Sequence, residues 1–330
     1  RICAELARAG IRPRRTLIFA TWDAEEWGII GSAEWVEEHR AELLDKLVAY
    51  VNQDMVVTGP NFGASGAPSM KPLVRSIARI APHPDEPERT IFDVWRGDAD
   101  DAPRIGTPGG GSDHGPFYLH LGVPVSSHGF GGRQGIYHSL YDTPAWMEKF
   151  GDPGYRRHRA NATMTALLMM RLANADTLPL DPLEEARELA EQLDKLDDDF
   201  SRLNADILHE GLKRDVAELR AAAELFNTRR AATCDAALDA ETLRAVNSRL
   251  RRLGPTLTRR AAGDGDPTAF YQNLLNGLAG GGGYRASRLP GLRAALDADD
   301  PAGLSHECVV LGGQIRAAAR LLNEAANMLP

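Results

Sequence analysis

Several features that would narrow the function are scarce in this sequence of 330 residues. It has three cysteines, Cys3, Cys234 and Cys308, which are too few and too widely spaced for a disulfide framework or a cysteine-based zinc site. Basic residues are in the minority, with 38 Lys and Arg against 46 Asp and Glu, and the formal net charge is −8. Because phosphate binding needs a basic face, this charge argues against nucleic acid as a partner.

Long apolar runs and targeting signals are also missing from the sequence. No apolar stretch is long enough to cross a bilayer, so we expect no membrane span in this chain. No signal peptide is visible. The sequence opens with Arg1 rather than Met, inside an amphipathic pattern that Gly10 would close as a helix cap. We therefore expect it to begin within a longer protein.

The first half of the sequence alternates patterns typical of strands and helices. Short apolar runs with β-branched and aromatic residues predict buried strands at residues 15–22, 47–54, 90–95 and 122–127. Helical patterns cover residues 32–44, 68–80, 117–121 and 153–175. This alternation predicts an α/β fold, with a mainly parallel sheet flanked by helices.

The composition changes near Pro179 and Pro182, and helical periodicity dominates the remainder. Apolar residues recur every three or four positions in residues 183–207, 212–226, 243–257 and 308–325. Four amphipathic helices favour an all-α bundle. We therefore predict two domains, residues 1–178 and 179–330, with residues 263–303 forming a long glycine-rich loop in the second.

Two adjacent glutamates, Glu25 and Glu26, follow the first predicted strand in Trp22-Asp-Ala-Glu-Glu-Trp-Gly28. In an open α/β sheet, ligands bind beyond the C-terminal ends of the strands. Successive side chains of an extended backbone point in different directions, so one glutamate could ligate a metal ion while the other accepts a proton from the attacking water. Taken alone, capping of the next helix by Asp23 and Glu25 is the favoured interpretation.

Three further positions favour a metal site. Asp54 ends the second apolar strand, where a carboxylate is costly unless it meets a cation or hydrogen bonds, although a solvated strand-end residue is an equal alternative. A lone histidine is more often structural, but His138, next to Tyr137 in a loop, would complete a zinc ligand set of imidazole and carboxylates. Ser112 or Asp113 is expected to cap a helix; alternatively, Asp113 or His114 lies next to the metal ligands or a substrate terminus.

Together these segments resemble the zinc exopeptidase family that contains glutamate carboxypeptidase II and the transferrin receptor. The resemblance is carried by Arg12-Pro-Arg-Arg-Thr-Leu-Ile-Phe-Ala-Thr-Trp-Asp-Ala-Glu-Glu-Trp-Gly28, and it continues in residues 31–35, 49–54 and 137–143. The helical part is similar to the family's dimerisation domain, with landmarks at residues 270–271, 284 and 289–292. The resemblance implies a zinc aminopeptidase-like α/β domain, a transferrin-receptor-like helical domain and a homodimer.

Carried over position by position, the resemblance implies a site with two zinc ions that hydrolyses peptides. Glu25 would be the general base. Glu26 and His138 would bind one zinc ion, and Asp54 would bind the other. Tyr137 would stabilise the substrate or the transition state.

The positions that face the substrate depart from glutamate carboxypeptidase II. Asp113 falls on an acidic position near the site in relatives, and Tyr284 matches a substrate-binding tyrosine. Where that enzyme uses cations to hold acidic side chains, this sequence has Ser127, Gly129 and Gly283. Because the electrostatic basis for acidic dipeptides is lost, we expect a broader exopeptidase, which could be a carboxypeptidase, an aminopeptidase or a dipeptidase.

The family's remaining metal ligands, a histidine and a bridging aspartate, lie upstream of the segment that matches residues 12–28, and residues 1–11 cannot supply them. Zinc needs about four ligands, so we expect this chain alone to bind zinc weakly and to be nearly inactive, while its complete protein is an enzyme. The resemblance also implies an extracytoplasmic, secreted or periplasmic location. The alternative function is a non-catalytic receptor-like or dimeric scaffold on the same fold.

Overall fold

The computed structural model describes residues 2–233, 238–257, 270–278 and 285–330. The chain divides into two compact units. Unit 1 comprises Arg1–Ala20, Val51–Thr107 and Val125–Ala175, and unit 2 comprises Thr21–Tyr50, Pro108–Pro124 and Asp176–Pro330. Because both units contain residues that precede position 179, the domain boundary inferred from composition stays a prediction.

The sheet of unit 1 has the strand order β1-β3-β2, formed by β1 (Tyr50–Asn52), β2 (Asn61–Gly66) and β3 (Val125–Gly131). Strand β2 pairs with β3 in antiparallel register, which differs from the predicted mainly parallel sheet. Strand β2 also lies outside the predicted strands. Its sequence, Asn-Phe-Gly-Ala-Ser-Gly, has low strand propensity, so its pairing depends on the partner strand rather than on composition.

Helices pack on the strands of unit 1 and enclose its core. Helices α4 (Lys71–Ala78) and α5 (Ile91–Arg96) contact β2, and α7 (Arg156–Asn174) contacts β3. The buried rings of Phe62 and Phe130 meet edge to face, with centroids 5.4 Å apart. The remaining helical segments of unit 1 are α1 (Ile2–Arg8), η1 (Pro68–Met70), α6 (Pro144–Trp146), η3 (Met147–Gly151) and η4 (Pro153–Tyr155).

The strand predicted at residues 90–95 is wrong, because this segment forms helix α5. Thr90 and Asp93 make a capping box at its start: Oγ1 of Thr90 accepts from the backbone N–H of Asp93 at 3.1 Å, and Oδ2 of Asp93 accepts from the backbone N–H of Thr90 at 3.2 Å. These bonds satisfy the first free N–H groups of the helix. They outweigh the strand preference of the aromatic and β-branched residues that follow.

The predicted buried strand at residues 15–22 is also absent from the structure. The side chains of Ile18 and Phe19 are 66% and 71% exposed. A strand is stable only when its backbone pairs with a neighbour, and the described residues provide no such neighbour here. Residues 15–22 therefore have a sequence typical of a strand but do not form one.

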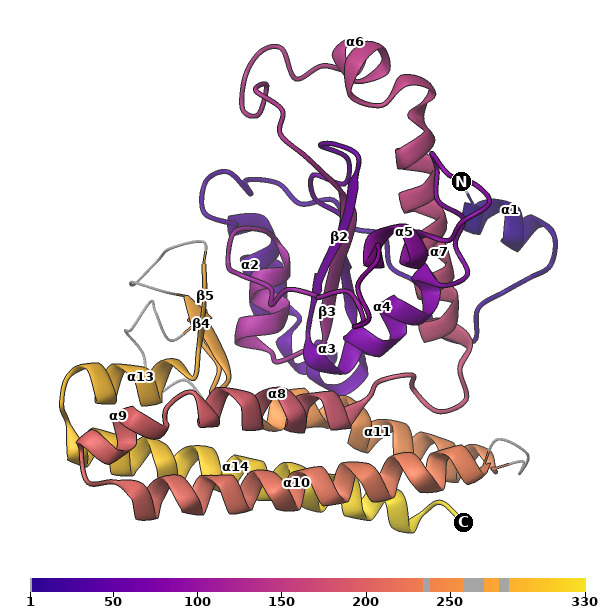
Figure 1. Cartoon of the computed structure of the whole chain (residues 1–330). Coiled ribbons are helices and arrows are strands. Elements are labelled where there is room, and N and C mark those ends of the chain that lie inside the picture. Colours follow the sequence, from indigo (N-terminus) through magenta and orange to yellow (C-terminus); the bar gives the residue numbers. More distant parts are fainter. Residues whose placement is uncertain (1, 234–237, 258–269, 279–284) are drawn as a thin grey trace. The chain divides into compact units, whose positions relative to one another are not determined.

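Unit 2 is built mainly of helices. Helix α10 (Asp206–Ala232) packs against α8 (Pro182–Asp194) and α14 (Pro301–Asn327), and α11 (Ala240–Thr256) packs against α14. Figure 1 shows α10 and α14 side by side along their length. The apolar periodicity is confirmed here, because Leu212, Val216, Leu311 and Ile315 are buried.

The remaining elements of unit 2 are shorter. They are α2 (Ile30–Glu38), α3 (Arg40–Lys46), η2 (Pro116–His120), α9 (Asp197–Arg202), β4 (Asn276–Leu278), β5 (Ala286–Arg288) and α13 (Pro290–Asp297). The predicted helix 32–44 is thus two helices, α2 and α3. Strands β4 and β5 form an antiparallel pair. Among the described residues, no helix combines the length and the apolarity that a membrane span requires.

Two predictions for the helical part need correction. The apolar pattern of residues 183–207 is divided among α8, α9 and the start of α10, and Ile207, expected in the core, is 86% exposed. Asn204 has a positive φ of 53°, which breaks the helix and changes the face on which the next apolar residue lies. The segment expected to be one long loop contains β4, β5 and α13, and its residues 263–269 and 279–284 lie outside the described residues.

Candidate active site

The segment that carries Glu25 and Glu26 folds into a tight turn rather than the extended backbone assumed from the sequence. Ala24 has a positive φ of 56°. The backbone N–H of Ile29 donates to the carbonyl of Glu25 at 2.7 Å, and that of Gly31 donates to the carbonyl of Asp23 at 3.1 Å. This turn leaves Glu25 half-buried and Glu26 exposed, so the two carboxylates lie in different environments.

Gly31 is needed for this turn. A Cβ atom at position 31 would lie 2.2 Å from the carbonyl oxygen of Asp23, a distance that a real side chain does not reach. The Asp23 side chain adds a second constraint, since its Oδ1 accepts from the backbone N–H of Ala24 at 2.9 Å. The close backbone approach therefore depends on the absence of a side chain at one position.

Asp54 follows strand β1 and is exposed, so the argument from the cost of burying its carboxylate does not apply. Its neighbour Gln53 is anchored to helix α7. Oε1 of Gln53 accepts from Nδ2 of Asn161 at 2.7 Å and from Oγ1 of Thr165 at 2.9 Å. Met55, on the other side, has a positive φ of 47°. The position of Asp54 is thus fixed by its two neighbours in the sequence.

Tyr137 and His138 lie in the loop between β3 and α6, and both are exposed. Their rings stack, with centroids 3.7 Å apart and an interplanar angle of 23°. His138 itself has a positive φ of 57°. Asp54, Tyr137 and His138 all belong to unit 1.

Asp113 belongs to unit 2, together with Glu25 and Glu26. Its Oδ1 accepts a hydrogen bond of 2.6 Å from Oγ of Ser32, in the first turn of α2. Helical structure begins at His114, directly after Asp113, so capping of this helix by Ser112 or Asp113 stays a prediction. Tyr284, the other predicted substrate-binding residue, lies outside the described residues.

The predicted metal ligands fit zinc in kind but not in number. Two carboxylates and one imidazole, from Glu26, Asp54 and His138, are ordinary zinc ligands. Glu26 belongs to unit 2, whereas the other two belong to unit 1. Across the residues that the structure describes, no three His, Cys, Asp or Glu side chains form a group that could hold a metal ion. The assignment of these three residues as zinc ligands therefore stays a prediction.

Three of the eight non-glycine residues with a positive φ in the described part of the chain lie in or next to predicted site segments. Ala24 precedes Glu25, Met55 follows Asp54, and His138 is itself in the left-handed region. Residues other than glycine adopt this conformation uncommonly, and it is concentrated at functional sites. A sequence pattern does not reveal this conformation at positions 24 and 55, since neither alanine nor methionine favours a positive φ.

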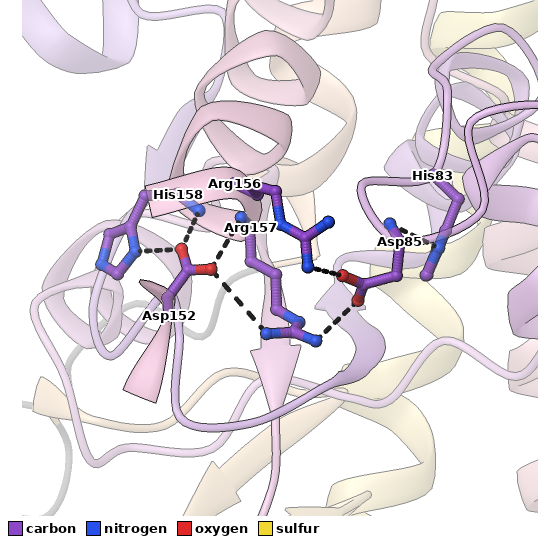
Figure 2. Close-up of polar contacts among 6 residues, drawn as sticks. All are labelled: His83, Asp85, Asp152, Arg156, Arg157 and His158. Carbon is purple, nitrogen blue, oxygen red and sulfur yellow. Dashed lines mark hydrogen bonds and ion pairs between the residues drawn. The ribbon is translucent and has the colours of Figure 1, made fainter. Parts of the chain in front are cut away.

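A polar cluster around Asp152, which lies between η3 and η4, was also not identified from the sequence. Figure 2 shows buried Asp152 accepting hydrogen bonds at the first turn of α7, while Arg157 reaches from Asp152 to Asp85. Nη2 of Arg157 donates to Oδ2 of Asp85 at 2.6 Å, and Nη2 of Arg156 donates to Oδ1 of Asp85 at 2.9 Å. The cluster ties the segment before α7 to the loop around His83 (Figure 2).

Comparison with known proteins finds relatives that cover most of this chain. A probable glutamate carboxypeptidase of Arabidopsis thaliana is 36% identical over 293 residues, which are 89% of this chain and 42% of the relative. A probable glutamate carboxypeptidase of Arthroderma benhamiae is 31% identical over 308 residues, 89% of this chain and 41% of the relative. The aminopeptidase NAALADL1 of Mus musculus is 32% identical over 197 residues, 54% of this chain and 26% of the relative.

These similarities link the chain to a family of peptidases. Residues 1–151 match the family model of peptidase family M28, and most of the rest of the chain is included in its similarity to the two probable glutamate carboxypeptidases. All predicted site residues except Tyr284 lie within the matched part. The chain spans less than half the length of each of these relatives.

Proposed function

We propose that the complete protein is a zinc-dependent exopeptidase, and that this chain supplies part of its active site. The observation that carries the proposal is the match of residues 1–151 to peptidase family M28. That part contains Glu25, Glu26, Asp54, Tyr137 and His138. The strained backbone at three of these segments supports it.

Each residue has a distinct role in the proposed reaction. Zinc, when bound, would lower the pKa of water and polarise the scissile carbonyl. Glu26 and His138 would hold one ion and Asp54 the other. Glu25, half-buried in its turn, accepts the proton of the attacking water and returns it to the leaving amine. Tyr137 donates a hydrogen bond from its hydroxyl to the carbonyl oxygen as negative charge develops there.

The substrates proposed are peptides with a broad range of terminal residues. Ser127, Gly129 and Gly283 lack the cationic groups that a preference for acidic side chains requires. Asp113, held by Ser32, and Tyr284 are proposed to contact the substrate. The relatives are named as carboxypeptidases and as an aminopeptidase. Both the C-terminus and the N-terminus of the peptide are therefore candidates for the end that is cleaved.

A peptide library tests this function directly. The complete protein would be incubated with peptides whose N-terminus or C-terminus is blocked, and the products identified by mass spectrometry. We expect single residues to be released from one unblocked end, with no dominant preference for glutamate. A strong preference for C-terminal glutamate would contradict the broad specificity, and no hydrolysis of any peptide would favour the non-catalytic scaffold.

The zinc requirement has its own test on this chain. Because zinc needs about four ligands and the chain offers only Glu26, Asp54 and His138 as predicted ones, we expect weak zinc binding and little activity from the chain alone. Isothermal titration with zinc measures this affinity. Tight binding of two zinc ions by the chain alone would contradict the proposal that other parts of the protein complete the site. An extracytoplasmic location remains part of the proposal, to be tested by cell fractionation.

A further inference from the structure

A pocket of about 350 Å³ in unit 2 is lined by three arginines. Arg285 precedes strand β5, Arg288 ends it, and Arg293 lies on α13. The rest of the lining consists of Gln192 from α8, Ala286 and Ser287. The volume lies within the range of small-molecule pockets. The concentration of cations is unusual for a chain whose formal net charge is −8.

Arg288 forms a fixed wall of this pocket. Its Nη1 donates to Oδ1 of Asn276 at 2.7 Å, and its Nη2 donates to Oε2 of Glu188 at 2.6 Å. Asn276 is buried, and its Nδ2 donates to the hydroxyl of buried Tyr118 at 2.7 Å. Because the carboxylate of Glu188 balances its charge, Arg288 mainly holds the shape of the pocket and contributes little net charge for binding a ligand.

The other two arginines supply the positive charge of the pocket. Nε of Arg293 donates to the backbone carbonyl of Arg288 at 3.0 Å, which orients the guanidinium and leaves its two Nη groups for a ligand. Within the described part of the chain, neither Arg285 nor Arg293 forms an ion pair with a carboxylate. Two guanidinium groups without a balancing carboxylate match the geometry and the charge of an oxyanion. The Ser287 hydroxyl and the Gln192 amide add neutral donors.

We propose that this pocket binds a small molecule through an oxyanion group, a carboxylate or a phosphate, held by Arg285 and Arg293. The proposal does not depend on the peptidase function, since all residues that line the pocket lie in unit 2 outside the part that matches the M28 family model. The framework of Arg288, Asn276 and Tyr118 keeps the pocket preorganised, which reduces the cost of binding.

Isothermal titration of the 330-residue chain with inorganic phosphate, and separately with citrate, tests this pocket. The titration is done at low ionic strength, because salt screens exposed charges. We expect saturable binding of at least one of the two anions, weakened about tenfold or more when Arg285→Gln and Arg293→Gln are combined. The matched control is Arg214→Gln, which removes an exposed arginine of α10 and should keep the affinity of the parent chain.

A second variant separates ligand binding from a structural role. Glu188→Gln removes the carboxylate that balances Arg288 and is expected to tighten anion binding, which loss of structure would not do. Circular dichroism verifies that each variant folds, and Arg285→Gln alone changes an exposed residue. Absence of saturable binding of both anions, or equal affinity of the parent chain and the double variant, would overturn the proposal.

Discussion

Asp152 accepts a hydrogen bond of 2.8 Å from Nδ1 of His158 through its Oδ2 (Figure 2). The same carboxylate accepts the backbone N–H groups of Arg157, at 3.2 Å, and of His158, at 3.0 Å. It therefore satisfies free donors in the first turn of α7 and places the imidazole hydrogen on Nδ1. Burial raises the pKa of Asp152, but the hydrogen bonds from His158 and Arg157 outweigh this effect, so the pKa lies below its ordinary value.

Replacement of Asp152 should destabilise unit 1. Asp152→Ala leaves two backbone N–H groups and the Arg157 guanidinium without their buried acceptor, and we expect a loss of about 2–4 kcal/mol in the free energy of unfolding. Urea denaturation followed by tryptophan fluorescence measures the loss. Asp198→Asn, a change at an exposed residue of α9, is the control and should stay within about 0.5 kcal/mol. Equal stability of the two variants would show that the cluster is not a structural anchor.

His128 should make the stability of unit 1 sensitive to mild acid. Burial lowers the pKa of His128 to about 4, and Nε2 interacts with Oγ1 of Thr165 at 3.1 Å. Because the unfolded chain takes up the proton near pH 6.5 and the folded chain only near pH 4, this stability is complete above pH 6.5. It is lost as the pH falls toward 4, by about 3 kcal/mol.

His128→Gln removes this titration while keeping a polar side chain next to Thr165. The difference in unfolding free energy between pH 7 and pH 4 should therefore be smaller in the variant than in the parent chain. Urea titrations at both pH values give this difference. An identical pH dependence for the two proteins would show that His128 is not the group responsible.

The long helices could be predicted from the sequence because one face of each is apolar. Leu212, Val216 and Ile315 recur at helical spacing and are buried as expected. The segment 15–22 could not be predicted, because a strand also depends on a partner that lies elsewhere in the chain. The capping box of Thr90 and Asp93 indicates the start of a helix. The aromatic and β-branched residues after it led instead to the prediction of a strand.

For the candidate site, the residue types and their order could be predicted from the sequence. The backbone conformation of the segments that carry them could not. Ala24, Met55 and His138 adopt positive φ values, which the sequence does not indicate for alanine or methionine. The anchoring of Gln53 on Asn161 joins residues 108 positions apart, and no local pattern indicates such a contact.

A side chain at position 31 should disrupt the turn that holds the two glutamates. Gly31→Ala places a Cβ atom 2.2 Å from the Asp23 carbonyl, so the turn must shift, and displacement of catalytic groups by about 1 Å lowers activity roughly a hundredfold. We expect a loss of this size in kcat/KM of the complete protein, with weaker zinc binding. Gly135→Ala is the control, because its Cβ has no atom within 4 Å. Unchanged kinetics for Gly31→Ala would show that the conformation of this turn does not affect catalysis.

Dimerisation through the helical part is a further prediction. Val309 on α14 is 66% exposed, and exposed aliphatic residues of this kind mark association surfaces when they cluster. Sedimentation should give twice the 35.9 kDa mass of the single chain, and Val309→Asp should shift the protein toward monomer. Ile80→Asp, at an exposed aliphatic residue of unit 1, should not. A monomer at every concentration would contradict the prediction.

The central claim is that Glu25 transfers protons while Glu26 binds metal. The most direct measurement is the zinc content and the peptidase turnover of the complete protein with Glu25→Gln or Glu26→Gln. Glu25→Gln should keep the zinc of the parent and lose about 10²–10⁴ in kcat, whereas Glu26→Gln should lose zinc as well as turnover. Full activity of Glu25→Gln, or a complete protein that hydrolyses peptides without binding zinc, would contradict the account.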